Sequence, residues 1–325
     1  MLGASLALLS AAAFALNLAT ARRGMVTGTA TQAMAISVPL GLACFLAATA
    51  ITGELFRSGD FPPRAAAWMA GFGILHFGIG RYCNFLAGQA AGVNLVVPVI
   101  QLNIVVTLAL AVFVLHEPCT ALQVIGGVLI VAGSIVAQRS GPGPIRTTSA
   151  GPSTFVPRLV AGYFFAALAA LAYGSSPIIA RFSLAETGPV HGLLGGLVAY
   201  ATATGVILLM LLVPSNRRNV IALDRPNLRW FVLSAIFVAI AQGFFFAAVA
   251  VAPIMLVTPL LQLALVFTLL ISKWLNPNHE VLGPNMIVGV VISIIGAMWV
   301  SIDTDVILDA LAIPGGLAHA LRWKV

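Results

Sequence analysis

The feature that most constrains this chain is a succession of long apolar runs, separated by short polar breaks, that continues almost from one end to the other. A membrane-spanning helix needs about 20 mainly apolar residues, and ten runs of the sequence are close to that length or longer. The expected spans are residues 2–21, 31–52, 65–87, 91–115, 119–138, 159–181, 190–213, 229–250, 252–274 and 281–302. Because 60% of the residues are hydrophobic and only 8% are charged, the composition excludes an ordinary soluble domain. We therefore predict an all-α integral membrane protein with ten transmembrane helices.

An internal repeat divides these helices into two halves of five. The stretches VNLVVPVIQLNIVVTLAL and IMLVTPLLQLALVFTLLI align along their whole length. The alignment pairs Pro98 with Pro259 and Gln101 with Gln262, in both cases 161 positions apart. An odd number of spans per half makes the second half enter the membrane from the opposite side, so we expect two inverted repeats.

The polar breaks suggest the domain boundaries. Residues 139–158 are rich in Gly, Pro, Ser and Thr and are predicted to link the halves. The expected organisation is a first repeat at 1–138, a linker at 139–158, a second repeat at 159–302 and an interfacial tail at 303–325. The tail is too interrupted to span a bilayer and carries Trp323 close to its end.

The sequence lacks the motifs that are typical of several functional classes. There is no Gly-rich phosphate loop ending in Gly-Lys-Ser/Thr, no His/Cys cluster and no nucleophile elbow. The sequence therefore favours neither an ATP-driven pump nor an enzyme, and we expect no cofactor and no metal. The net charge of +7 resides mostly in the breaks between spans, which indicates lipid-facing loops and no nucleic-acid partner.

Short motifs after the fourth helix of each half carry a family resemblance. They are LHEP at residues 115–118 and NHE at 278–280, each preceded by a helix with an internal proline and followed by a helix with glycines spaced by seven. In this the chain resembles the EamA type of the drug/metabolite transporter superfamily. The resemblance implies a ten-helix carrier or exporter of amino acids, metabolites or drugs that does not hydrolyse nucleotides. Glu117 and Glu280, within these motifs, are expected to cap or close turns between spans.

The stretch HFGIGRYCNF, residues 76–85, places an arginine deep inside the third predicted span. A mid-helix arginine costs about 3 kcal/mol on insertion scales, so Arg81 needs compensation. On a regular helix Gly78, Arg81, Asn84 and Gly88 share one stripe, and the repeat mate of Arg81 is Gln242. One interpretation is that Arg81 binds an anionic group such as a carboxylate through its guanidinium fork. The other is that it snorkels or pairs with a buried polar group as part of the structure.

Other polar residues at similar depth complete the candidate substrate site. The prolines Pro98 and Pro259 break helical hydrogen bonds beside Gln101 and Gln262, which favours either helix breaks that line a cavity and serve gating, or kinks with amides that join neighbouring helices. Candidate ligands from the first helix of each half are Asn17, Tyr173 and Ser176.

His76 has two interpretations. It is the natural proton-coupling group if transport is driven by protons, because its charge changes near physiological pH. A lone histidine in a membrane span also serves as a neutral hydrogen-bonding residue.

Taken together, these patterns predict a secondary transporter of a small organic solute, acting as an exporter by alternating access between two inverted repeats. The alternative is a membrane scaffold or sensor without transport activity. The expected partners are a small-molecule substrate and the lipid bilayer, a homodimer stays open, and the expected location is the plasma (inner) membrane of a prokaryote.

Two signals disagree on orientation. Ten Lys and Arg residues follow odd-numbered spans and five follow even-numbered ones, which places both termini outside, whereas the resemblance implies cytoplasmic termini.

Overall fold

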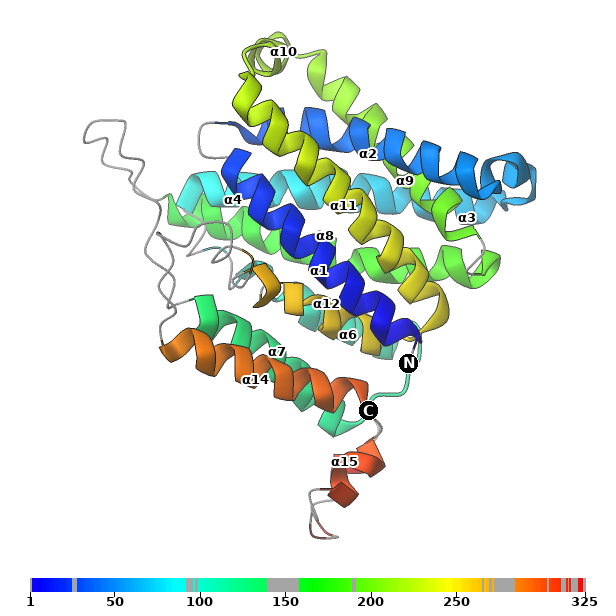
Figure 1. Cartoon of the computed structure of the whole chain (residues 1–325), viewed down its shortest axis with the longest axis vertical. Helices are drawn as coiled ribbons and strands as arrows, with labels where there is room; N and C mark the ends of the chain where they lie inside the picture. Colours follow the sequence, from blue (N-terminus) through cyan, green and yellow to red (C-terminus); the bar gives the residue numbers. More distant parts are fainter. Residues whose placement is uncertain are drawn as a thin grey trace.

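The computed structural model describes residues 2–24, 28–91, 96, 99–138, 158–188, 191–264, 266–268, 271, 284–302, 304–310, 314, 316 and 321–323. These residues form helices and no strand (Figure 1). Pro98, Glu280 and all of the predicted linker except Arg158 lie outside the described residues.

The helices follow the apolar runs of the sequence closely. The first half contains α1 (Leu2–Gly24), α2 (Ala30–Thr52), the 3-10 helix η1 (Glu54–Asp60), α3 (Pro63–Phe72), the π-helix η2 (Gly73–Gly80), α4 (Arg81–Ala91), α6 (Asn103–Phe113) and α7 (Ala121–Gln138). The second half contains α8 (Leu159–Thr187), α9 (Gly192–Leu211), α10 (Pro214–Ile221), α11 (Arg225–Val251), α12 (Ile254–Leu261), α14 (Pro284–Ser301) and α15 (Thr304–Ala310).

Five of these helices are long and apolar enough to cross a membrane, namely α1, α2, α8, α9 and α11. The third predicted span is continuous from Pro63 to Ala91 but is divided by its π-helical segment. In the fourth and ninth predicted spans the described helices α6 and α12 are shorter, because a turn interrupts each run at Gln101 and at Gln262.

Local sequence signals explain where helices start. At α2, the Thr29 hydroxyl accepts a hydrogen bond from the Gln32 N–H at 3.3 Å, and the Gln32 side chain accepts one from the Thr29 N–H at 2.9 Å, which is a capping box. At α11 the Asp224 carboxylate accepts from the Asn227 N–H at 3.2 Å. Gly53, with φ of +78°, ends α2 in the left-handed conformation that glycine adopts without strain.

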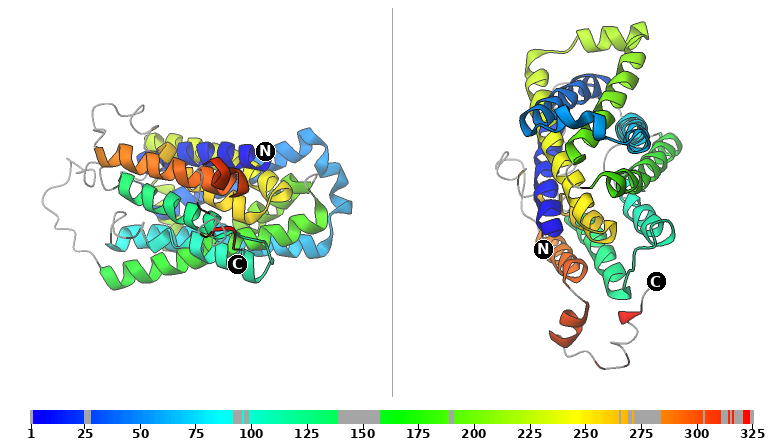
Figure 2. Two further views of the ribbon diagram at one scale, coloured as in Figure 1. Left: turned by 90° about the horizontal axis from the view of Figure 1, so that it is seen from below. Right: turned by 90° about the vertical axis from the view of Figure 1, so that its right-hand side faces the viewer.

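Helices pack in pairs that take one member from each half. The helix α1 lies along α11, and α8 lies along the third span, which is made of α3, η2 and α4 (Figures 1 and 2). Similarly, α2 packs on α9 and α7 packs on α14. When the two halves are exchanged, the pair of α1 and α11 becomes the pair of α8 and the third span. The pair of α2 and α9 and the pair of α7 and α14 each become themselves. The arrangement therefore has the contact pattern of two related repeats.

The crossing of α7 and α14 is especially close because glycines meet there. A Cβ added to Gly126 would lie 2.8 Å from the Gly296 carbonyl oxygen, and one added to Gly133 would lie 2.5 Å from that of Gly289. Between these two contacts the Ser293 hydroxyl donates to the Ile130 carbonyl at 3.3 Å. Because the partner number falls as the α7 number rises, the two helices run antiparallel.

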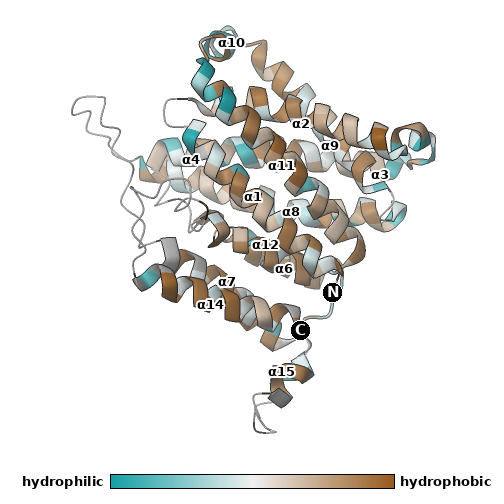
Figure 3. Cartoon of the chain, in the orientation of Figure 1, coloured by the Kyte–Doolittle hydropathy of each residue, from teal (hydrophilic) through white to brown (hydrophobic). Residues whose placement is uncertain are grey.

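Large apolar side chains are exposed along the outer faces of the helices. Val160, Leu212 and Phe113 expose 87%, 76% and 73% of their surface, and Figure 3 shows hydrophobic residues along most helices, with hydrophilic ones gathered at α10 and at helix ends. Such a surface is stable in hydrocarbon and costly in water. The fold is that of a multi-pass integral membrane protein.

Candidate functional site

The third span carries its part of the candidate site on the π-helical segment and on the first turn of α4. Two glycines let this segment approach its neighbours: a Cβ on Gly73 would meet the backbone of Ala199 in α9, and a Cβ on Gly80 would lie 2.9 Å from the Tyr173 ring in α8. In a π-helix the hydrogen bonds run to the fifth residue along, so side chains lose the register of a regular helix, and such segments are frequent at functional sites.

The π-helical segment departs from the register that the regular-helix stripe assumed. Gly78 faces Val206 of α9 and lines an outer groove of about 410 Å³ together with Tyr82 and Cys83. Arg81 lies in the region of His76, of Tyr173 in α8 and of Tyr200 in α9, because its charge acts on all three. The common face of Gly78 and Arg81 was expected for 3.6 residues per turn throughout, and it stays a prediction.

His76 joins the two halves through Gln242 of α11. The Gln242 amide nitrogen lies 3.2 Å from His76 Nε2, so the ring nitrogen accepts and the imidazole is neutral in this bond. The ring also stacks on Phe72, with 4.9 Å between centroids, and lies 5.0 Å from the Tyr173 ring. His76 Nδ1 and Gln242 Oε1 are buried and have no hydrogen-bond partner among the described residues.

Arg81 is half-buried beside this bond. Its Nη1 nitrogen is shielded from solvent without a hydrogen-bond partner in the described part of the chain, and neither of the ion pairs found there involves it. Its charge acts electrostatically on His76, Tyr173 and Tyr200. One turn further, the Asn84 amide lies 3.5 Å from the Tyr173 hydroxyl. The structure thus brings together five of the predicted site residues, which we call the arginine cluster: His76, Arg81, Asn84, Tyr173 and Gln242.

A second group of amides forms where the fourth and ninth spans are broken. The Gln262 amide donates to Asn103 Oδ1 at 3.0 Å, and the Asn103 amide donates to the Ile100 carbonyl at 2.8 Å. Gln101 is buried, and its amide nitrogen has no partner among the described residues. Pro259 lies inside α12, whose last turn closes through the Gln262 N–H and the Pro259 carbonyl at 3.0 Å.

Two predicted residues make their polar contacts elsewhere. Asn17 accepts a hydrogen bond from the Ser234 hydroxyl at 2.6 Å, which joins α1 to α11. The Ser176 hydroxyl donates to the Ala172 carbonyl of its own helix. Neither contact connects Asn17 or Ser176 to the arginine cluster.

Sequence reasoning missed three polar residues of the interior. Tyr200 of α9 is fully buried with its ring 4.3 Å from that of Phe77, and neither its hydroxyl nor that of Thr204, one turn on, has a described partner. Their spacing of four residues in the run YATAT was an available signal. The third, Asn103, stood outside the repeat pattern because its mate, Ala264, is apolar.

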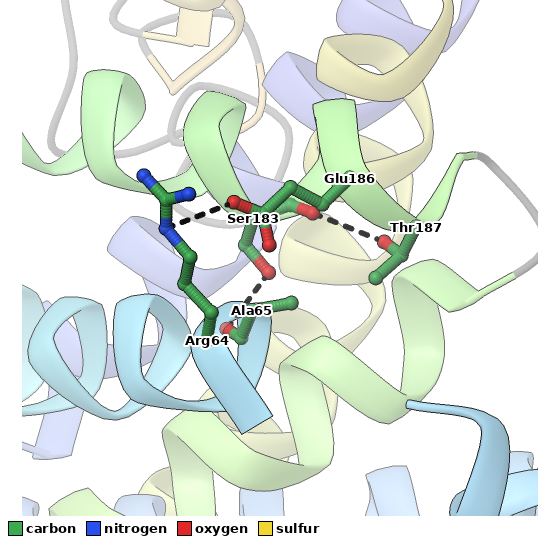
Figure 4. A network of polar contacts seen from close by, with 5 residues as sticks. All are labelled: Arg64, Ala65, Ser183, Glu186 and Thr187. Atoms are coloured by element: carbon green, nitrogen blue, oxygen red, sulfur yellow. Dashed lines mark hydrogen bonds and ion pairs between the residues drawn. The ribbon is translucent and has the colours of Figure 1, made fainter. Parts of the chain in front are cut away.

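Both ends of the helices are held by polar contacts outside the cluster. Figure 4 shows Arg64 paired with Glu186 at 3.3 Å and the Ser183 hydroxyl donating to the Ala65 carbonyl at 3.0 Å, which ties the start of α3 to the end of α8. At the end of α1, the Arg23 guanidinium lies 5.0 Å from the centre of the Trp230 ring. These contacts join neighbouring spans at their ends, away from the arginine cluster.

Glu117 supplies a further connection between the halves. Its two carboxylate oxygens accept hydrogen bonds from the N–H groups of Ile254 and Met255, both at 3.0 Å, at the start of α12. A carboxylate is favoured at a helix N-terminus by the unsatisfied N–H groups and by the helix dipole. The capping role expected for Glu117 is confirmed.

The fold and the site together define a polytopic helical membrane protein with a buried polar cluster made by both halves. The chain belongs to the EamA-like transporter family, whose model matches residues 1–138 and 160–302, and thereby to the drug/metabolite transporter superfamily. This is a family of transporters and not of enzymes. A solved crystal structure, described only as that of a protein, is similar with a TM-score of 0.69 and 19% identity over 91% of this chain and 96% of the other, which supports the fold alone. No curated protein matches the sequence.

Proposed function

We propose that this protein is a secondary transporter of a small organic solute, acting as an exporter by alternating access between two inverted repeats of five spans each. The proposed location is the plasma (inner) membrane of a prokaryote. The observation that carries the proposal is the arginine cluster, in which both halves contribute buried polar atoms without described partners. A buried polar group that lacks a partner is costly, and a bound solute can satisfy it.

The crossing of α7 and α14 supports the inverted arrangement. These helices are the fifth of each repeat, and they run antiparallel with Gly126 against Gly296 and Gly133 against Gly289. Gly126 is the repeat mate of Gly289, and Gly133 is that of Gly296. The contacts are therefore reciprocal, as a twofold axis lying in the membrane plane requires.

In the proposed site Arg81 binds an anionic group of the solute. The guanidinium fork suits a carboxylate, and the Asn84 and Gln242 amides, which contact Tyr173 and His76 in the same cluster, are further hydrogen-bonding groups. The broken spans at Gln101 and Gln262 supply backbone groups at membrane depth, which is where discontinuous helices of transporters bind solutes. A scaffold or sensor without transport has no need of such a cluster, and no contact in the described part of the chain favours that alternative.

Thermal stabilisation of the purified protein tests the site. We expect carboxylate-bearing compounds from a panel of organic acids, amino acids and amphipathic cations to raise the melting temperature of the parent protein, because a ligand that binds the folded state stabilises it. The shift should vanish in Arg81→Gln and persist in Arg64→Gln, an arginine variant outside the cluster. Carboxylate hits that are unchanged in Arg81→Gln would refute the binding role. Uptake by inside-out vesicles, faster than by right-side-out vesicles, would establish export, and the reverse would refute it.

A further inference from the structure

The arginine cluster holds one permanent positive charge and no carboxylate in the described structure. The chain has nine acidic residues, and those with described contacts are engaged at helix ends. Glu54 and Glu117 accept from helix N–H groups, Glu186 pairs with Arg64, Asp224 caps α11 and Asp305 pairs with Arg322.

This distribution limits the charge of the solute. A zwitterionic solute would place an ammonium group beside Arg81, where it is repelled by a like charge. No carboxylate in the described part of the cluster would balance that ammonium, so a zwitterion is disfavoured. A dianion would leave one negative charge unbalanced in the same buried place. His76 adds no charge while it accepts the Gln242 hydrogen bond. A monoanion alone makes the filled cluster neutral.

The surroundings of the cluster also favour a solute with an apolar body. Aromatic rings of Phe72, Phe77 and Tyr173 surround His76, and the Tyr200 ring of α9 packs against Phe77. Aromatic faces bind apolar and aromatic groups while the guanidinium binds the anionic head.

We propose that the protein is an obligatory exchanger of organic monoanions, in which the site passes through its closed form only when a bound anion neutralises Arg81. This inference rests on the proposed transport function and deepens it. Closing the empty site would strip water from an unpaired guanidinium, whereas closing the filled site encloses a neutral ion pair. The empty carrier therefore returns slowly, and an anion on the far side speeds the return.

Exchange can be measured with sulfonates, which keep their charge at any working pH. The probes are benzenesulfonate as the monoanion, benzenesulfonamide as its neutral analogue and benzenedisulfonate as the dianion. Proteoliposomes are loaded with labelled benzenesulfonate and diluted into buffer that contains none of the probes or one of them. We expect efflux into probe-free buffer to be slower by roughly tenfold or more than into benzenesulfonate, which corresponds to about 1.4 kcal/mol or more in the barrier. Benzenesulfonamide and benzenedisulfonate should not accelerate efflux.

Variants of Arg81 separate charge from geometry. Arg81→Lys keeps the charge, so efflux should still depend on the external monoanion, with weaker binding than in the parent. Arg81→Gln removes the charge, so any remaining flux should no longer depend on an external anion. Arg64→Gln serves as the matched control and should behave as the parent.

The outcomes distinguish this inference from the proposed function. Saturable efflux from parent proteoliposomes that is equally fast with and without external benzenesulfonate would overturn obligatory exchange and leave the transport function standing. Equal acceleration by benzenesulfonamide or benzenedisulfonate would overturn the monoanion rule. Efflux from parent proteoliposomes no faster than from protein-free liposomes would count against both proposals.

Discussion

Replacing Gly126 by alanine should loosen the contact between α7 and α14. The new methyl carbon would lie 2.8 Å from the Gly296 carbonyl oxygen and 3.0 Å from Trp299 Cβ, and the first of these atoms is backbone, so the helices must shift. Overpacking of this kind costs about 1–3 kcal/mol. The alanine also gains about 1 kcal/mol in helix propensity, which partly offsets the strain.

The neighbouring glycine provides a control that cancels the propensity gain. Gly127 is also buried in α7, but a Cβ there would touch only the flexible end of Leu108, at 3.4 Å. The difference in stability between Gly126→Ala and Gly127→Ala therefore measures the strain alone. We expect Gly126→Ala to be less stable than Gly127→Ala by about 1–3 kcal/mol, a difference of several degrees in melting temperature at most.

Thermal unfolding in detergent, followed by tryptophan fluorescence, measures this difference. Trp299 lies beside Gly126 and reports on the crossing itself. If Gly126→Ala melts at or above the temperature of Gly127→Ala, the close approach of the two helices, and with it the support for a twofold axis, is refuted.

Three further predictions concern polar contacts at helix ends. Glu117→Ala removes both acceptors from the start of α12 and should cost about 1.5–3 kcal/mol in thermal unfolding, while Glu117→Gln, which keeps one acceptor, should cost less. Arg64→Gln breaks an ion pair whose arginine side chain is 78% exposed, so its effect should stay under about 1 kcal/mol and shrink further at high salt. Desolvation raises the pKa of Glu54, against the lowering effect of nearby helix N–H groups and His191, so the folded state binds this proton more tightly than the unfolded state. The parent protein should therefore lose stability relative to Glu54→Gln as the pH rises from the acid range to neutral, and melting curves in which the parent gains instead would contradict this sign.

Much of the architecture could be predicted because it depends on one-dimensional patterns. Apolar runs of bilayer length and the recurrence of Pro, Gln and Glu at a common offset led to the membrane class, the two repeats and the family, and the family match confirms the last of these. Ten spans remain a prediction, since five described helices have the required length and hydropathy. Three of the predicted spans that fall short are interrupted, the third by the π-helix at Gly73–Gly80 and the fourth and ninth by turns at Gln101 and Gln262. The other two, α7 and α14, are uninterrupted but have shorter apolar segments.

The candidate site was harder to predict, because polar residues in apolar runs look alike in sequence. The sequence predicts Asn17 and Gln242 equally for the substrate site. In the structure Asn17 is hydrogen-bonded to Ser234, whereas Gln242 is hydrogen-bonded to His76. Tyr200 and Asn103 were overlooked, because no polar residue of the span at 190–213 was proposed for the site and Asn103 lacks a polar mate in the repeat.

The sequence by itself therefore determined that the protein lies in a membrane and that it contains two repeats. Hydropathy predicts which surroundings each segment prefers, and the repeat predicts which segments correspond. The tertiary structure decided which polar atoms meet. That outcome depends on where a helix leaves its regular period and on how closely neighbouring backbones approach. The π-helix that ends just before Arg81 changes the helical period, and the missing side chain of Gly126 allows the close approach of two backbones. Neither can be read from hydropathy.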